Sequence, residues 1–238
     1  MNDQYQYQTQ SQTGAGVAYD EGLRKFMLGV YNYMGLGLLA TAIVAYAMMN
    51  NPELARAAQG TFFIPFIGII AIGFIGPRFI YSSSPVVAHA IYWTYVALWG
   101  WLIGPTVASY TGAGMATEVY KAFFITATVF GSVSLYGYTT KKDLAPMGKF
   151  LFMAVVGLLI AIVLNFLIFK SGLMSFGISA LVVIVFSALT AYETQMIKNM
   201  YHEQADNNRA SIFGAFMLYG SFVTLFIHIL NILGFMND

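Results

Sequence analysis

The stretch 175-SFGISALVVIVFSALTAYETQMIKN-199 decides the fold class of this chain. It is long and apolar enough to cross a hydrocarbon core of about 30 Å, which takes about 20 residues of helix. A single acid, Glu193, lies inside it. A charged side chain in a bilayer costs about 2.5–3.5 kcal/mol on insertion scales, so such an acid by default marks a functional site. We therefore expect a membrane protein whose chemistry is centred on Glu193.

The composition of the whole chain agrees with this expectation. Of its 238 residues 58% are hydrophobic and 9% are charged, and the mean hydropathy is +0.68. A net charge of +1 gives no reason to expect a nucleic acid as partner. The absence of cysteine excludes disulfides, thiol catalysis and zinc–thiolate sites. Residues 1–22 are polar, so we predict a disordered cytoplasmic tail there and a transmembrane domain over residues 23–238.

The hydrophobic residues fall into blocks that each suit one membrane crossing. We predict an all-α polytopic protein with seven transmembrane helices, at Lys25–Met48, Phe62–Tyr81, Val86–Ser109, Val119–Tyr138, Met147–Phe169, Ser175–Asn199 and Ala210–Leu233. A transmembrane barrel is excluded because its strands would alternate polar and apolar residues, which these blocks do not.

The positions of lysine and arginine orient the helices. With the amino terminus in the cytoplasm, the cytoplasmic segments contain Arg24, Lys25, Arg78, Lys141, Lys142, Lys149, Lys198 and Arg209. The outer segments then contain only Arg56, Lys121 and Lys170. Because cytoplasmic loops are enriched in basic residues, we predict a cytoplasmic amino terminus and an external carboxyl terminus.

Polar side chains form stripes on the last two predicted helices. Beside Glu193 the sixth helix carries Ser187, Thr190 and Thr194 at helical spacing. The seventh helix carries Ser221, Thr224, His228 and Asn231 at intervals of three, four and three residues, on one face. Such stripes should face each other or a wet cavity, so these residues are candidates for lining an ion pathway. The alternative for the hydroxyls and Asn231 is hydrogen bonding between helices, worth about 0.6 kcal/mol per contact.

Arg78 is the predicted partner of Glu193, because both residues lie near the cytoplasmic ends of their helices. An ion pair there would close the inner mouth of the bundle, and protonation of Glu193 would release it. The alternative is that Arg78 extends its charge to the membrane interface.

Three segments carry a resemblance to a known family: 141-KKDL-144, 191-AYETQMIK-198 and 218-LYGSFVTLF-226. They resemble the Bax inhibitor-1 family in a bacterial form, which implies an integral multi-pass protein of the bacterial inner membrane. The resemblance also implies seven helices with one at the centre, and a pH-sensitive calcium leak. Calcium would be a permeant ion, and no cofactor is expected.

The resemblance assigns roles to three positions of this chain. It implies that two carboxylates on the sixth and seventh helices control the leak together with an arginine latch from the second helix. The first carboxylate corresponds to Glu193 and the latch to Arg78, but the second corresponds to Ser221, where the sequence departs from the family pattern. Calcium prefers several oxygen ligands with compensating negative charge, so we expect Glu193 to bind calcium more weakly than two acids would.

Two other classes of function are weighed against a leak channel. The protein could be a non-conducting regulator that binds a membrane protease or a stress-response partner, with the polar tail and the cytoplasmic loops as its working parts. Enzymatic activity is not expected, because Ser221 and His228 are separated by two helical turns, or about 10 Å, and cannot form a catalytic pair directly.

Overall fold

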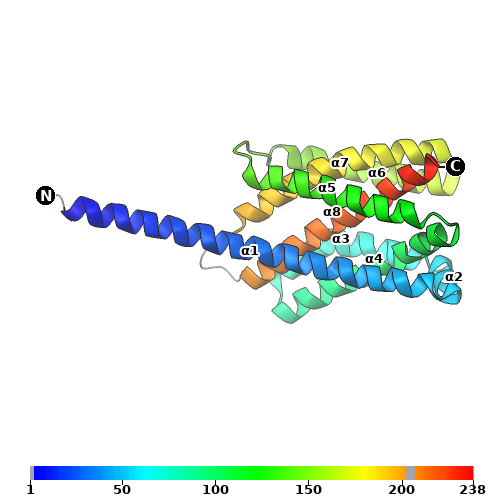
Figure 1. The fold of residues 1–238 in the computed structure, drawn as a ribbon, viewed down its shortest axis with the longest axis horizontal. Helices are drawn as coiled ribbons and strands as arrows, with labels where there is room; N and C mark the ends of the chain where they lie inside the picture. Colours follow the sequence, from blue (N-terminus) through cyan, green and yellow to red (C-terminus); the bar gives the residue numbers. More distant parts are fainter. Residues whose placement is uncertain (1–2, 202–206, 238) are drawn as a thin grey trace.

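The computed structural model describes residues 3–201 and 207–237, of which residues 3–20 and Asn207 are described as backbone only. The described residues form helices joined by short loops (Figure 1). In chain order these are α1 (Asp3–Met49), α2 (Pro52–Gly60), α3 (Phe63–Ser82), α4 (Pro85–Gly112), α5 (Ala116–Thr139), α6 (Met147–Leu164), the π-helical η1 (Asn165–Phe169), α7 (Gly172–Asn199) and α8 (Asn207–Phe235).

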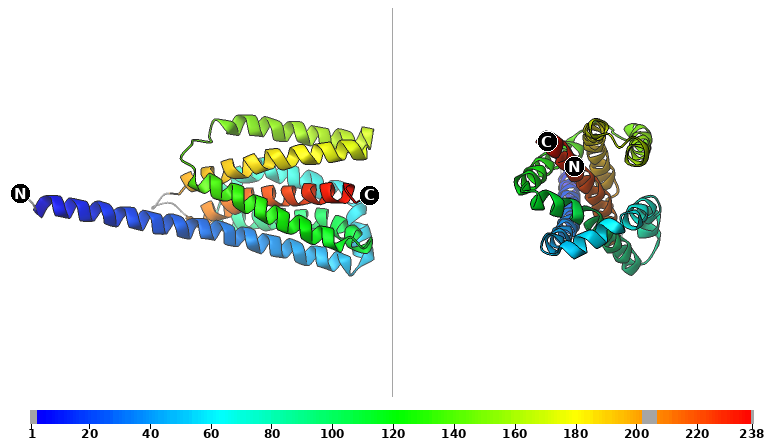
Figure 2. Two further views of the ribbon diagram at one scale, coloured as in Figure 1. Left: turned by 45° about the horizontal axis from the view of Figure 1, so that its top comes forward. Right: turned by 90° about the vertical axis from the view of Figure 1, so that its right-hand side faces the viewer.

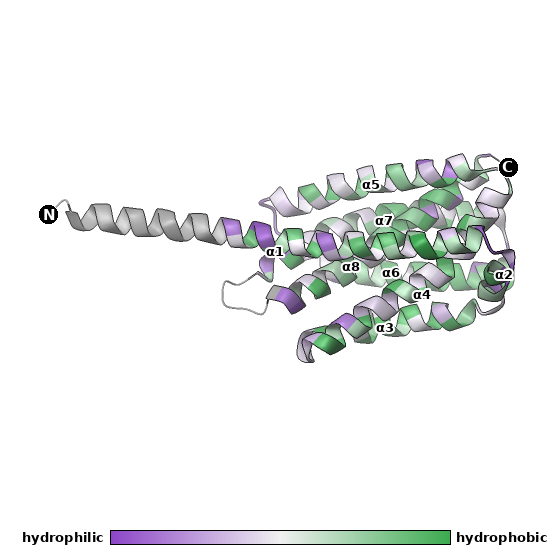
Figure 3. Ribbon diagram, turned by 60° about the horizontal axis from the view of Figure 1, so that its bottom comes forward, coloured by the Kyte–Doolittle hydropathy of each residue, from purple (hydrophilic) through white to green (hydrophobic). Residues whose placement is uncertain are grey.

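Seven of these helices are long and apolar enough to cross a membrane, as the sequence predicts. They are α1, α3, α4, α5, α6 with η1, α7 and α8. Large apolar side chains cover their outward faces: Leu39, Ile64 and Leu173 are 58%, 69% and 73% exposed. Figure 3 shows hydrophobic residues along the length of the bundle. Exposed apolar surface of this extent is expected where lipid, and not water, surrounds a protein.

Helix α8 is the centre of the bundle. It packs against α1, α3, α4, α5 and α7, and in Figure 2 it runs through the middle of the surrounding helices. In its most apolar window 67% of the residues are buried, against 11–33% in the other six spans. The polar residues of α8 therefore face protein on most sides, which agrees with the central helix implied by the family resemblance.

The two termini lie at opposite ends of the bundle (Figure 1). Following the predicted orientation, we call the end near the amino terminus the inner end and the other the outer end. Helix α1 begins at Asp3, and its first part projects beyond the inner end. A helix without packing partners is only marginally stable in water. The disorder predicted for residues 1–22 stays a prediction. Residues 1 and 2 of this segment lie outside the part of the chain that the structure describes.

Helix α2 is an element that the sequence prediction missed. Residues 49–61 fall between two predicted spans, but Asn51 caps a short helix there. Its side chain accepts hydrogen bonds from the backbone N–H groups of Glu53 and Leu54, and Pro52 occupies the first turn. Asparagine at the cap followed by proline is a known signal for a helix start.

Candidate functional site

The acid that α7 carries inside the membrane is held by the central helix. Glu193 is 4% exposed and Ser221 of α8 is 2% exposed. The Ser221 hydroxyl donates a hydrogen bond to Glu193 Oε2 at 2.7 Å. Glu193 lies six residues before the end of α7 at Asn199, or about 9 Å along the helix from its inner end. The structure thus joins two predicted site residues in one buried pair.

Aromatic side chains close the space around this pair. The ring of Tyr95, from α4, lies 4.3 Å from that of Phe216 and 6.0 Å from that of Tyr219, centroid to centroid. The Tyr95 hydroxyl is 2.7 Å from the point that a Cβ atom on Gly220 would occupy. The glycine next to Ser221 therefore lets a tyrosine approach the backbone of α8 closely.

Two further tyrosines tie α1 to the same region. The Tyr219 hydroxyl shares a 2.6 Å hydrogen bond with Thr41, and the Tyr92 hydroxyl donates to the carbonyl of Tyr33 at 2.6 Å. Both tyrosines are fully buried. These two hydrogen bonds join α1 to α8 and α4 to α1 beside the buried pair.

The predicted ion pair between Arg78 and Glu193 is not formed, and this corrects the sequence interpretation. Arg78 is exposed near the inner end of α3, and the described residues contain no salt bridge between it and Glu193. The physical reason is the order of the helices. Helix α3 packs mainly on α4 and α8, whereas Glu193 reaches α8 from α7. A similar depth in the membrane does not bring the two residues together.

Polar side chains join α7 and α8 at two points, and most of the stripe hydroxyls also bond within their own helices. Besides Glu193–Ser221, His228 Nδ1 lies 3.0 Å from the hydroxyl of Ser179 on α7. The hydroxyls of Ser187, Thr190, Thr194 and Thr224 each donate to the carbonyl four residues earlier in the same helix. Asn231 lies near the outer end of α8 and is partly buried. Most of the predicted pathway residues therefore do not present a free hydroxyl to a pore.

The sequence interpretation missed a chain of hydroxyls between α1, α5 and α7. The Tyr31 hydroxyl lies 2.7 Å from Ser134 Oγ, which lies 2.9 Å from Thr194 Oγ1. The spacing of polar residues could have placed Ser134 on a helix, but it could not show that Ser134 faces Thr194.

Gln195 was also missed, although it is a polar residue in an apolar span. It accepts from the Leu144 N–H and donates to the Lys142 carbonyl, both at 2.8 Å, and so holds the α5–α6 loop against α7.

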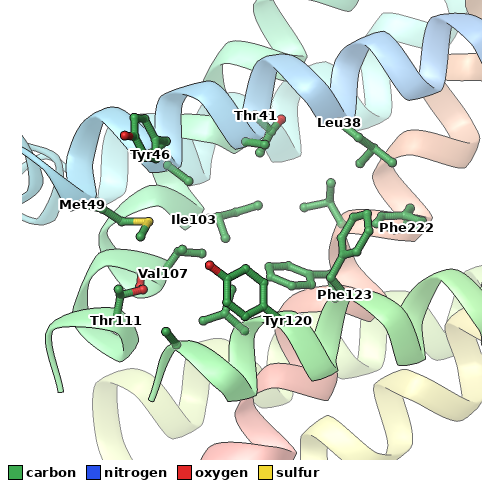
Figure 4. A pocket seen from close by; sticks show the side chains of 16 residues that line it. Leu38, Thr41, Tyr46, Met49, Ile103, Val107, Thr111, Tyr120, Phe123 and Phe222 are labelled. Carbon is green, nitrogen blue, oxygen red and sulfur yellow. The ribbon is translucent and has the colours of Figure 1, made fainter. Parts of the chain in front are cut away.

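An apolar cavity occupies the outer half of the bundle (Figure 4). Its volume is about 340 Å³, and its walls come from α1, α4, α5 and α8. Thr41 and Tyr120 are among the few polar side chains that line it. Phe222, the residue after Ser221, also lines it. The cavity therefore extends from the outer half of the bundle to the residue next to the buried pair.

The chemistry of the pair limits what it can bind. Glu193 supplies one carboxylate and Ser221 one hydroxyl, and the described residues contain no group of three or more His, Cys, Asp or Glu side chains that could hold a metal. Calcium usually takes six to eight oxygen ligands. Backbone carbonyls or water would have to complete a shell at Glu193, so calcium binding there stays a prediction.

Comparison with known proteins supports the resemblance seen in the sequence. Residues 23–238 match the family described as "Inhibitor of apoptosis-promoting Bax1". The chain is 37% identical to the inner membrane protein YbhL of Escherichia coli, with 90% of this chain and 92% of YbhL covered. It is 40% identical to an uncharacterised protein of Caulobacter vibrioides (92% of each chain) and 36% identical to one of Rickettsia prowazekii (97% and 98%).

Proposed function

Because the chain belongs to the Bax inhibitor-1 family, we propose that it is a calcium leak channel or ion transporter of the bacterial inner membrane. The observation that carries this proposal is Glu193, a buried acid at the contact between α7 and the central helix α8. Intramembrane acids mark ion and proton pathways. The closed state, in this proposal, is held by the Glu193–Ser221 hydrogen bond, and the inner membrane location is suggested by the name of the relative YbhL.

The sign of the pH response follows from the surroundings of Glu193. A neutral carboxylic acid fits a dry site, whereas a carboxylate with one hydroxyl partner would attract water or a cation. Tyr95 of α4 interacts electrostatically with Glu193, and the described residues contain no salt bridge between Glu193 and Arg78. Loss of the proton should therefore draw water or a cation into the site and increase flux as the pH rises. This sign is opposite to that expected from an Arg78 latch.

The test is calcium flux through the purified protein in liposomes, measured over a pH series. Wild-type flux should increase with pH. Glu193→Gln keeps the shape of the neutral acid and cannot ionise, so its flux should stay low and become independent of pH. Arg78→Ala is the matched control, because it removes a charge at the inner end without touching the buried pair, and it should behave like wild type.

Three results would count against the proposal. Absence of calcium flux in the wild type would remove the leak function itself. An unchanged pH profile in Glu193→Gln would show that Glu193 is not the sensor. If Arg78→Ala alone abolished the pH response, the arginine latch would be the better mechanism.

A second candidate is a non-conducting regulator that binds a membrane protease or another stress-response protein. The observation that favours it is the length of α1, which continues beyond the inner end of the bundle (Figure 1). Deletion of residues 1–18 separates the two functions. A leak through the bundle should survive the deletion, whereas crosslinking of a partner through the tail should be lost.

A further inference from the structure

A groove opens between α1 and α5 in the inner half of the bundle. Both helices pack on α8, but in the described part of the chain they make few contacts with one another. The space between them is about 620 Å³ and is lined by residues of these two helices. Specific ligand sites usually measure about 300–1,000 Å³. Because the groove lies on the outside of a transmembrane bundle, its surroundings are lipid.

The wall of this groove is apolar with a few polar groups at one side. Leu28 of α1 and Leu135 of α5 form its lips and are 51% and 61% exposed. Gly131 leaves it wide, because no atom lies within 4 Å of the position that a Cβ there would take. The hydroxyls of Tyr31 and Ser134 lie against its floor. Such a wall suits an acyl chain with ester oxygens at one end.

The inner rim of the groove is rich in positive charge. Arg24 lines the groove itself and is exposed, and Lys25 follows it on α1. Lys141 and Lys142 are exposed just beyond the end of α5. The acids at this rim are Glu21, one turn before Arg24, and Asp143, whose Oδ1 is occupied by the N–H of Ala145.

We propose that this groove binds an anionic glycerophospholipid of the inner leaflet, with its phosphate at Arg24 and one acyl chain beside Gly131. The charge of the rim selects an anionic headgroup, and the apolar lips select a membrane lipid over a soluble anion. A bound lipid would also give the atoms that line the groove neighbours to pack against, because atoms that line a void lose dispersion attraction. This groove is separate from the Glu193–Ser221 pair. Lipid binding is measured directly, so its outcome does not depend on whether the protein conducts ions.

The experiment is native mass spectrometry of the full-length protein. The protein is incubated with equimolar phosphatidylglycerol and phosphatidylcholine that carry identical acyl chains. Wild-type protein should retain phosphatidylglycerol in preference. Gly131→Phe should remove the retained lipid by filling the groove. Gly157→Phe is the matched control: Gly157 is also exposed with no atom near its Cβ position, but it lies on α6, and its variant should retain lipid normally.

Arg24→Gln tests the headgroup contact independently, in case the larger substitution impairs folding. Because one basic residue near an anionic surface is worth about 1 kcal/mol, the preference for phosphatidylglycerol should fall about fivefold. Arg24→Lys keeps the positive charge and should retain most of the preference for phosphatidylglycerol. Equal retention of the two lipids by wild type, unchanged retention by Gly131→Phe, or an unchanged preference in Arg24→Gln would overturn the proposal.

Discussion

At the scale of single residues, the hydroxyl of Ser221 is the only described hydrogen-bond donor to the carboxyl group of Glu193. Ser221→Ala should lower the free energy of unfolding by about 0.6 kcal/mol, the average for a hydrogen bond between membrane helices. It should also raise calcium flux at low pH, because the neutral acid loses its tie to α8. Ser132→Ala is the control, since Ser132 is exposed and bonds only within α5. Thermal unfolding in detergent and liposome flux provide both readouts, and identical behaviour of the two variants would contradict the role given to Ser221.

Ser221→Asp should change the response in another way. The Ser221 oxygen lies 2.7 Å from Glu193 Oε2, so the new carboxylate would share a proton with Glu193 and titrate with it as a coupled pair. Two acids also offer calcium more charge than one. We expect tighter calcium binding and a shifted pH profile of flux relative to wild type. Calcium titration of the purified variant, with Ser221→Asn as the uncharged control, measures this, and equal affinities would contradict it.

Sequence reasoning located the acid but assigned its direct contact to Arg78 instead of Ser221. The apolar run around Glu193 and the spacing on α8 were sufficient to predict that Glu193 and Ser221 belong to one polar site. Depth in the membrane suggested Arg78 as partner, but depth does not tell which helices are neighbours. Helix α3 meets α4 and α8, and Arg78 lies on its exposed side. Tyr92 and Tyr95 lie at helical spacing on one face of α4, but spacing does not tell that this face packs beside the Glu193–Ser221 pair.

At the scale of helices, the contact of α5 with α7 depends on one glycine. A Cβ atom on Gly137 would collide with the backbone of Ala191, two residues before Glu193. Backbone cannot move aside as a flexible side chain can, so Gly137→Ala should cost about 1–3 kcal/mol of stability. Gly131→Ala is the matched control on the same helix, because its Cβ position is open. A thermal midpoint in detergent that falls for Gly131→Ala as much as for Gly137→Ala would refute this.

The helices themselves were largely predictable, because a membrane crossing demands a long apolar run. All seven predicted spans correspond to observed helices. Helix α2 was missed because it is short, lies between two spans and is rich in alanine and not in large apolar residues. Its signal was local, in Asn51 and Pro52. The π-helical end of α6 was missed as well: there Asn165 accepts from the Ser171 N–H and donates to Ser175, contacts that hydropathy cannot predict.

At the scale of the whole molecule, the odd number of spans determines where the termini lie. Seven crossings place the two ends of the chain on opposite sides, and Figure 1 shows them at opposite ends of the bundle. The direction depends on the basic residues, which gather at the inner ends of the helices. Arg24, Lys141 and Lys142 are exposed there, and Lys198 donates to the Tyr138 carbonyl at 2.8 Å. Positive charge near span ends favours the cytoplasmic side.

This orientation yields the last prediction. Alkaline phosphatase fused after residue 238 should be active, because the enzyme folds only outside the cytoplasm, and green fluorescent protein at the same point should stay dark. Moving the fusion point to the α5–α6 loop, after Lys142, should reverse both signals and provides an internal control. If the carboxyl-terminal fusion fluoresced, the inner and outer ends would have to be exchanged. The lipid groove and the short distance from Glu193 to the end of α7 would then belong to the opposite face of the membrane.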